Sequence, residues 1–183
     1  MSEQEKHRSR GEELLRKFGV TKIEIELGKL IFYFEKKLIV GSTGSLRIEH
    51  EGEQDFGSIG VALELFFGKK LIFRATRIQN RMELLEKGVD SDRMKSVPGH
   101  KDLNIVFATE FLSQATEYGH TNIQEGDELS NDLNIMIYDG DKMLRLDGES
   151  YAFTFKGDPK DALLGMLVLK SNKAKSKWTK RKK

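Results

Sequence analysis

The sequence of 183 residues contains no cysteine and only two prolines. Without cysteine the chain cannot form a disulfide framework or use thiolate chemistry, and this composition suits a reducing compartment. Long apolar runs are also absent: the longest, residues 162–169, is interrupted by Gly165 and falls far short of the ~20 residues of a membrane-spanning helix. The charged N-terminus leads into no apolar run. We therefore expect no secretory signal, anchor or membrane span, and a cytoplasmic protein.

Acidic residues are absent from the last fourteen positions, 170–183, which hold seven lysines and one arginine. The whole chain has 31 basic and 29 acidic side chains, so residues 1–169 keep 23 basic against 29 acidic ones. A near-neutral total thus conceals a body of formal charge −6 and a tail of +8. Such a tail can neutralise the phosphates of nucleic acid, lie on an anionic membrane or fold back on its own acidic body.

This tail contains all the candidate binding residues that the sequence indicates. They are Lys170, Lys173, Lys175, Lys177, Trp178, Lys180, Arg181, Lys182 and Lys183. Trp178 is the only tryptophan of the chain, and an aromatic ring within a cationic segment can stack on an unpaired base or lie at a membrane interface. The sequence therefore predicts a non-enzymatic binding protein whose tail engages nucleic acid, RNA or DNA, non-specifically. A solubilising disordered tail is the alternative that stays open.

The tail also bears on location and on contacts within the chain. Residues 180–183 would serve as a nuclear address in a host that has a nucleus. An acidic segment with Glu125, Asp127, Glu128 and Asp132 is expected to be a solvated surface, with a docking place for the tail as the alternative. In that second case nucleic acid would displace the tail, and binding would depend strongly on salt.

The periodicity of apolar residues predicts a β-rich domain. Alternation with a period of two, together with turn glycines and Asp-Gly pairs, indicates strands, although residues 103–112 would also suit a helix. The predicted strands are 21–27, 30–34, 37–40, 46–49, 59–67, 71–75, 103–112, 133–138, 142–146 and 151–155. Helical spacing and end signals indicate helices at 2–17, 78–87 and 162–169, the last preceded by Asp158 and Pro159. A long surface loop is expected at 113–132.

These elements predict a mainly β fold, either all-β or α+β. The expected architecture is an antiparallel β-barrel or sandwich of about nine to eleven strands with two or three peripheral helices. A chain of this length can bury one sizeable core. We therefore expect an N-terminal polar helix (1–19), a single β-rich globular domain (20–169) and a disordered basic tail (170–183).

No motif predicts a cofactor, a metal ion or a catalytic residue. The loop 41–45 resembles a phosphate cradle, but Leu46 stands where a P-loop continues with a lysine. The acidic residues around Asp139 suggest calcium only superficially, because Met143 and Leu144 occupy the third ligand position and the glycine position of a calcium loop. Turn chemistry explains both features without a ligand.

Two other functions stay open. The first is a self-assembling structural protein of viral or phage type, such as a matrix, tail or capsid-associated protein. It would form homo-oligomers through strand edges or through the apolar helix at 162–169, an expectation by analogy of fold alone. The second is a hydrolase in which His100, His120 and Glu125, with Asp102 or Glu117, converge from the loops at 100–128.

Overall fold

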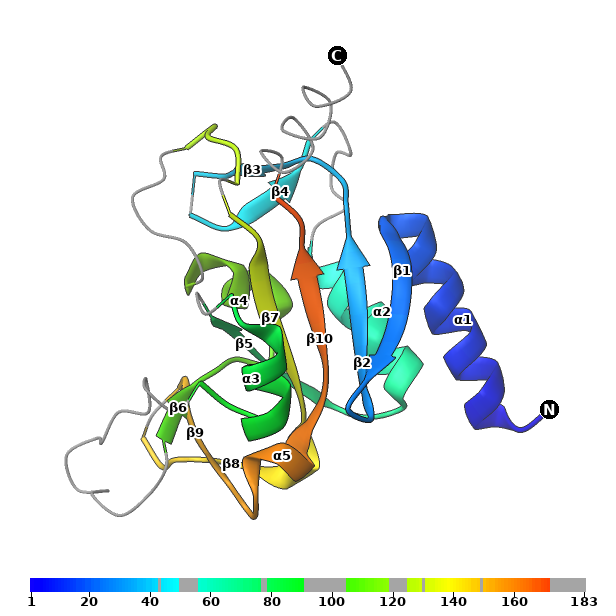
Figure 1. The fold of residues 1–183 in the computed structure, drawn as a ribbon, viewed down its shortest axis with the longest axis vertical. Coiled ribbons are helices and arrows are strands. Elements are labelled where there is room, and N and C mark those ends of the chain that lie inside the picture. The colour runs from blue at the N-terminus through cyan, green and yellow to red at the C-terminus, as the bar shows by residue number, and fades with distance from the viewer. Residues whose placement is uncertain are drawn as a thin grey trace.

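A computed structural model describes residues 1–42, 44–49, 56–76, 79–90, 105–118, 125–129, 131–148 and 150–171 of the chain. Its centre is an open five-stranded sheet with the order β1–β2–β10–β7–β5 (Figure 1). The strands are β1 (Val20–Glu26), β2 (Lys29–Phe34), β10 (Leu163–Leu169), β7 (Leu133–Asp139) and β5 (Leu71–Thr76). β10 runs parallel to β2, and the other neighbouring pairs are antiparallel. The last strand in sequence therefore lies in the middle of the sheet.

Helices and two small antiparallel sheets surround this central sheet. One small sheet pairs β3 (Leu38–Val40) with β4 (Leu46–Ile48); the other has the order β6 (Ile105–Phe107), β9 (Ala152–Phe155), β8 (Met143–Arg145). One face of the central sheet packs against α1 (Glu3–Phe18), α2 (Phe56–Phe67) and α4 (Leu112–Tyr118). The opposite face packs against α3 (Arg81–Lys87), α5 (Pro159–Ala162) and the three-stranded sheet. In the described ranges, no helix is both long enough and apolar enough to cross a membrane.

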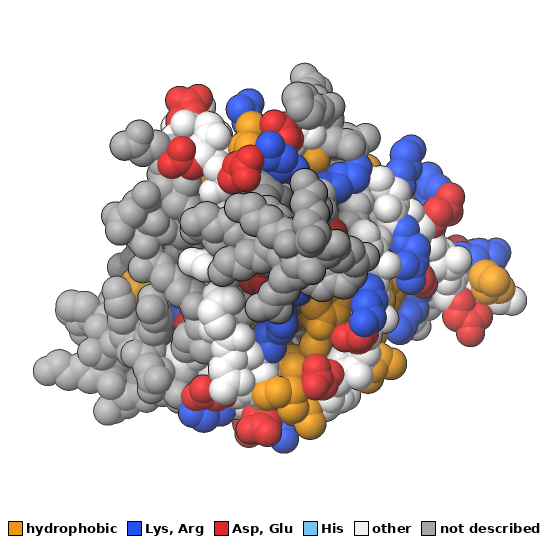
Figure 2. Space-filling view, turned by 45° about the horizontal axis from the view of Figure 1, so that its top comes forward, with side chains coloured by type: hydrophobic (Ala, Val, Ile, Leu, Met, Phe, Trp, Pro, Cys, Tyr) orange, Lys and Arg blue, Asp and Glu red, His pale blue; other side chains and the backbone are white. Residues whose placement is uncertain are grey.

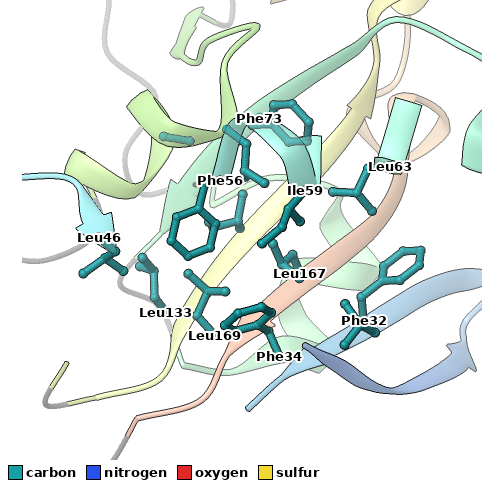
Figure 3. Packing of buried hydrophobic residues seen from close by; sticks show 14 of the residues in the cluster. Phe32, Phe34, Leu46, Phe56, Ile59, Leu63, Phe73, Leu133, Leu167 and Leu169 are labelled. Atoms are coloured by element: carbon teal, nitrogen blue, oxygen red, sulfur yellow. The ribbon is translucent and has the colours of Figure 1, made fainter. Parts of the chain in front are cut away.

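Of the two cores that pack on the central sheet, the larger lies between α2 and the sheet. Figure 3 shows side chains of α2 pointing towards those of β2, β7 and β10. The labelled members are Phe32, Phe34, Leu46, Phe56, Ile59, Leu63, Phe73, Leu133, Leu167 and Leu169. Each large side chain of this kind stabilises the fold by about 1.5–3 kcal/mol when it is fully buried. α1 joins the layer through Gly11, where a Cβ would come within 2.6 Å of the Phe66 backbone nitrogen.

The opposite face of the sheet has a core of its own. Ile31, Met136 and Met166 are completely buried there and belong to one cluster with Leu84 and Leu85 of α3. Because both faces of the sheet are covered, the central strands carry apolar side chains without alternation. All seven residues of β7 are buried.

Elements with strong local signals agree with the sequence predictions. Ser2 and Glu5 form a reciprocal capping box at the start of α1, and Gly19 ends the helix. Leu27 and Gly28 both have positive φ, 51° and 75°, as the two-residue turn of the β1–β2 hairpin requires. Residues 147–148 turn the β8–β9 hairpin as expected. The helix expected at 78–87 is α3, and Gly88 ends it in the left-handed conformation.

The predicted barrel is wrong, although the described residues form ten strands, which agrees with the predicted number and with a β-rich class. The five-stranded sheet does not close: β1 and β5 are its two edges. The pairing is also not purely antiparallel, because β2 and β10 are parallel. Helices pack on both faces of the sheet (Figure 1), so the architecture is mixed α/β.

The helix predicted at 162–169 is also wrong. Asp158 caps α5 and Pro159 begins it, as the sequence indicates, but the helix ends after one turn at Ala162. The following residues form β10, six of whose seven residues are buried. A strand that is covered on both faces has the same apolar composition as a buried helix, and periodicity cannot separate them. The segment is therefore no surface helix through which the protein could assemble.

The converse error occurs at 59–67, which was expected to be a strand and lies within helix α2. Its residues are almost all apolar, so hydrophobic periodicity again could not distinguish a strand from a helix. The buried residues of this segment include Ile59, Ala62, Leu63 and Phe66. Residues 113–118, expected to be loop, belong to α4, where Ala115 and Thr116 are buried. The pair Asp139-Gly140 begins the 3-10 turn η2 (Gly140–Lys142) instead of a hairpin, and it joins strands of two different sheets.

Gly165 tests the placement of β10. A Cβ at this position would overlap the carbonyl oxygen of Leu30 in β2, so we expect Gly165→Ala to lower the free energy of unfolding by about 1–3 kcal/mol. In a helix the same change would instead raise it by about 0.5–1 kcal/mol. Gly157→Ala is the matched control, because nothing lies within 4 Å of a Cβ there. Denaturant unfolding of the two variants gives the sign of the change in the free energy of unfolding. A Gly165→Ala variant that is more stable than the unmodified chain would contradict the strand.

Candidate functional site

The first residues of the basic tail are fixed on the central sheet. The backbone N–H of Lys170 donates to the Phe34 carbonyl oxygen at 3.0 Å, which continues the pairing of β10 with β2. The N–H of Ser171 donates to Asp132 Oδ1 at 2.8 Å, and Lys170 Nζ lies 3.5 Å from Asp132 Oδ2. Of the predicted binding residues, only Lys170 is described. Residues 173–183, with Trp178, lie outside the described residues.

Lys170 belongs to a group of cations around Tyr33. The centroid of the Tyr33 ring lies 5.6 Å from Lys170 Nζ, 5.8 Å from Lys22 Nζ and 5.8 Å from Arg81 Cζ. Each distance is within the ~6 Å over which a cation is attracted to an aromatic face. We call these four residues, with the carboxylates of Glu24 and Asp132, the Tyr33 cluster. It brings together the end of β10 and parts of β1, β2 and α3.

Strand pairing explains why these side chains share one face. Lys22 of β1 is the register partner of Tyr33 in the hairpin, and Val168 is its partner in the parallel pair with β10. Paired residues point to the same side of a sheet. The face is that of the smaller core, against which the half-buried Tyr33 packs. Arg81 arrives from the first turn of α3.

The start of α3 is held by a cap. The Asn80 side chain accepts a hydrogen bond of 3.2 Å from the Glu83 backbone N–H, so Arg81 is the first residue of the helix. A capped first turn is worth about 1 kcal/mol to the helix. The cap therefore helps to hold the Arg81 guanidinium over the strand face.

The charges of the cluster are only partly compensated. Lys22 pairs with Glu24 and Lys170 pairs with Asp132, whereas Arg81 has no ion pair among the described residues. The hydrogen bond and the charge of Glu24 raise the pKa of Lys22. Hydrogen bonds from Lys22 and then from Tyr33 lower the pKa of Glu24. The cluster as defined thus has three cations and two carboxylates, and the charges of Glu35 and Glu26 also act on Lys22 and Tyr33 from nearby.

The Tyr33 phenol stays neutral in this setting. Its burial, and then the hydrogen bond and charge of Glu24, raise the pKa of the hydroxyl, and nearby Arg81 only partly opposes them. A neutral ring keeps a face on which a cation or another π-system can lie. Figure 2 shows that Lys and Arg side chains also gather in a column over β1 and α1, beside this part of the sheet.

A second charged group, Arg74 with Asp90, is structural. Arg74 donates to both carboxylate oxygens of Asp90, at 2.8 and 3.0 Å, and to the Phe107 carbonyl oxygen at 2.8 Å. Both side chains are buried. The nearby Tyr138 hydroxyl donates to the Gly88 carbonyl oxygen at 2.7 Å, and burial raises its pKa far above the ordinary value. These groups are satisfied within the core, and they tie β5 and β7 to the segment after α3.

The predicted hydrolytic site is not assembled by the described residues. His100, His120 and Asp102 lie outside the described ranges. Glu117 accepts a hydrogen bond of 2.9 Å from the Ser45 hydroxyl, and Glu125 is exposed. Among the residues that the structure describes, no three His, Asp or Glu side chains form a group that could hold a metal ion.

A shallow hollow of about 220 Å³ lies between α2 and the start of α4. Its lining combines the small residues Gly57 and Gly60 with Val61, Glu64 and Phe111. Pockets that bind small ligands usually have about 300–1,000 Å³. Glu110, also in the lining, already pairs with Arg145 at 2.7 Å. The hollow therefore shows fewer features of a binding site than the Tyr33 cluster does.

Sequence reasoning named two members of the Tyr33 cluster, Lys170 and Asp132, and missed Tyr33, Lys22, Glu24 and Arg81. The signal for Lys170 was the run of cations that follows it. Tyr33 looks like any aromatic residue of an apolar strand. Lys22 reaches it through the β1–β2 hairpin, Lys170 through the parallel pairing of β2 with β10, and Arg81 from α3. No local pattern encodes the last two approaches.

No protein-family model matches the chain, and neither a curated protein nor a solved structure is significantly similar to it. The inference of function therefore depends on the charges and contacts of the described residues and on the composition of the tail.

Proposed function

We propose that the protein binds nucleic acid non-specifically through its basic tail and has no catalytic role. The observation that carries this proposal is the position of the tail's first residue. Lys170 lies at the same ring as Lys22 and Arg81, so the eight cations of the tail begin next to two further cations of the folded domain. A polyanion that lies along the tail would meet further cations where the tail joins the sheet.

Counterion release is the physical basis of such binding. Each phosphate neutralised on duplex DNA contributes about −0.9 to the slope of log K against log salt. Engagement of all eight tail cations would give a slope of about −7. The acidic body, with its formal charge of −6, repels nucleic acid elsewhere on the surface and so confines contact to the tail and its surroundings.

Asp132 supports a further part of this proposal. It was one of four acidic residues considered as a docking place for the tail, and it does bind Lys170 and Ser171. Glu128, by contrast, pairs with Lys37 at 2.8 Å. Asp132 therefore holds the base of the tail, and a phosphate that approaches Lys170 competes with this carboxylate.

A lysine-replacement series tests the proposal. In the full chain, Lys177, Lys180, Lys182 and Lys183 are replaced by Gln. The slope of log K against log salt should then become less negative by about 3–4, because four phosphate contacts are lost. Fluorescence anisotropy of a labelled duplex oligonucleotide across a salt series measures the slope.

The matched control replaces four exposed lysines outside the tail: Lys6, Lys87, Lys156 and Lys160. This variant loses the same charge and should keep the slope of the unmodified chain. Equal losses in the two variants would show that the tail has no special role, and an unmodified chain that binds no oligonucleotide would refute the proposal.

The exposed edge of the sheet favours self-assembly as a second candidate function. Among the described residues no strand pairs with the outer edge of β1. The strand end also carries exposed apolar side chains, Ile25 at 75% and Leu27 at 49% exposure. Unpaired edges are templates for further strands. A second copy, antiparallel across a two-fold axis at Ile23, would place each Lys22 opposite the Glu24 of the other copy, a favourable cross-strand pair.

A charge swap tests this edge-to-edge pairing. Lys22→Glu and Glu24→Lys should each reduce the mass of the assembly, because like charges then oppose one another across the edge. The double variant should restore the mass. Light scattering over a concentration series measures it, and a strict monomer in the unmodified chain at high concentration would rule this function out.

A further inference from the structure

We infer that the Tyr33 cluster is a base-stacking subsite that selects single-stranded over duplex nucleic acid. This inference rests on the proposed function, since the tail supplies the general attraction to phosphates. A run of lysines gains from the phosphates of either form and does not by itself favour the single strand. The folded surface at the base of the tail adds what lysines cannot, namely an aromatic ring in a fixed position. Single strands are bound in this way, by aromatic platforms beside a cationic path.

The position of the ring meets the first requirement of a stacking platform. Tyr33 extends from a central position of β2, with neighbours in β1 and β10 on either side, so the strands fix its backbone. It is half-buried, which leaves part of the ring at the surface while the smaller core supports the rest. A ring held in this way loses little conformational freedom when a base stacks on it.

The surrounding cations meet the second requirement, a partner for phosphate. Lys22 and Lys170 already have carboxylate partners, whereas Arg81 forms no ion pair among the residues that the structure describes. Its planar guanidinium can donate two parallel hydrogen bonds to a phosphate. We therefore assign the phosphate contact to Arg81 and the base contact to Tyr33.

Binding at this site is an exchange of partners. In the free protein, three cations occupy positions around the Tyr33 ring. A phosphate draws a cation away from the ring, and a base then takes the place of the cation on the ring face. The exchange is favourable, because stacking of a base on an aromatic side chain is stronger than an exposed cation–π contact. Only an unpaired base can take part, since the bases of a duplex are stacked on one another.

Three labelled probes of one sequence separate base from phosphate: the single strand, the same strand annealed to its complement, and an abasic single strand. With the full chain at one salt concentration, Tyr33→Leu should weaken binding of the normal single strand roughly tenfold. Binding of the duplex and of the abasic strand should stay unchanged. Tyr33→Phe keeps the ring and should keep the affinity.

Two further variants complete the design. Tyr151→Leu is the matched control, because this tyrosine is also partly exposed, at 41%, and lies outside the cluster; its affinities should equal those of the unmodified chain. Arg81→Gln should weaken the normal and the abasic single strand alike, because it removes a phosphate partner and leaves the ring. Thermal unfolding of each variant shows whether the fold is retained. If Tyr33→Leu does not fold, the affinities of the unmodified chain for the normal and the abasic single strand decide the case: tighter binding of the normal strand supports the subsite, and equal binding overturns it.

The outcomes of this experiment are distinct. Loss of single-strand binding alone in Tyr33→Leu supports the subsite. Equal loss for all three probes overturns it, since a stacking ring would not affect an abasic strand. No loss in Tyr33→Leu or in Arg81→Gln, while the tail variant with four glutamines binds weakly, overturns the subsite and leaves the proposed function standing. Failure of the unmodified chain to bind any probe overturns both.

Discussion

The parallel pairing of β10 with β2 is the contact on which the rest of the structure depends. β10 is the last strand of the chain, yet it separates the N-terminal hairpin from β7 and β5. Five register pairs, from Gly165 with Leu30 to Leu169 with Phe34, hold it against β2. Without β10 the β1–β2 hairpin has no neighbouring strand in the sheet. Both cores then also lose buried side chains, Leu167 and Leu169 on one face and Met166 and Val168 on the other. Folding of the N-terminal half therefore depends on a segment at the other end of the sequence.

This pairing also sets the position of the basic tail. Because β10 runs parallel to β2, it ends beside Phe34, and its next residue joins the face that holds Tyr33 and Lys22. An antiparallel arrangement would have sent the tail to the opposite end of the sheet. The cationic tail thus leaves the acidic body at a place where two further cations, Lys22 and Arg81, lie over the Tyr33 ring. Asp132 holds the first two residues of the tail there, which links the division of charge along the sequence to a defined place on the fold.

Local signals predicted those elements that depend on short-range chemistry. The glycines that end α1 and α3 and the turn at Gly28 each act within a few residues, and these elements formed as expected. The segment of β10 was predicted to be a helix and that of α2 a strand, because each is apolar almost throughout. Their identity is decided by what covers them, and that depends on the whole fold. The Tyr33 cluster was missed for the same reason, since Arg81 and Lys170 reach the ring only through long-range contacts, although Lys170 itself belonged to a visible run of charge.

The most direct test of this account is a nuclear magnetic resonance measurement on the backbone of residues 163–169. The account predicts extended-chain shifts for Met166. It also predicts cross-strand contacts from Met166 to Ile31 on one side and to Met136 on the other, as the two registers require. Helical shifts with contacts between residues three positions apart would contradict the central strand, and with it the placement of the tail beside Tyr33.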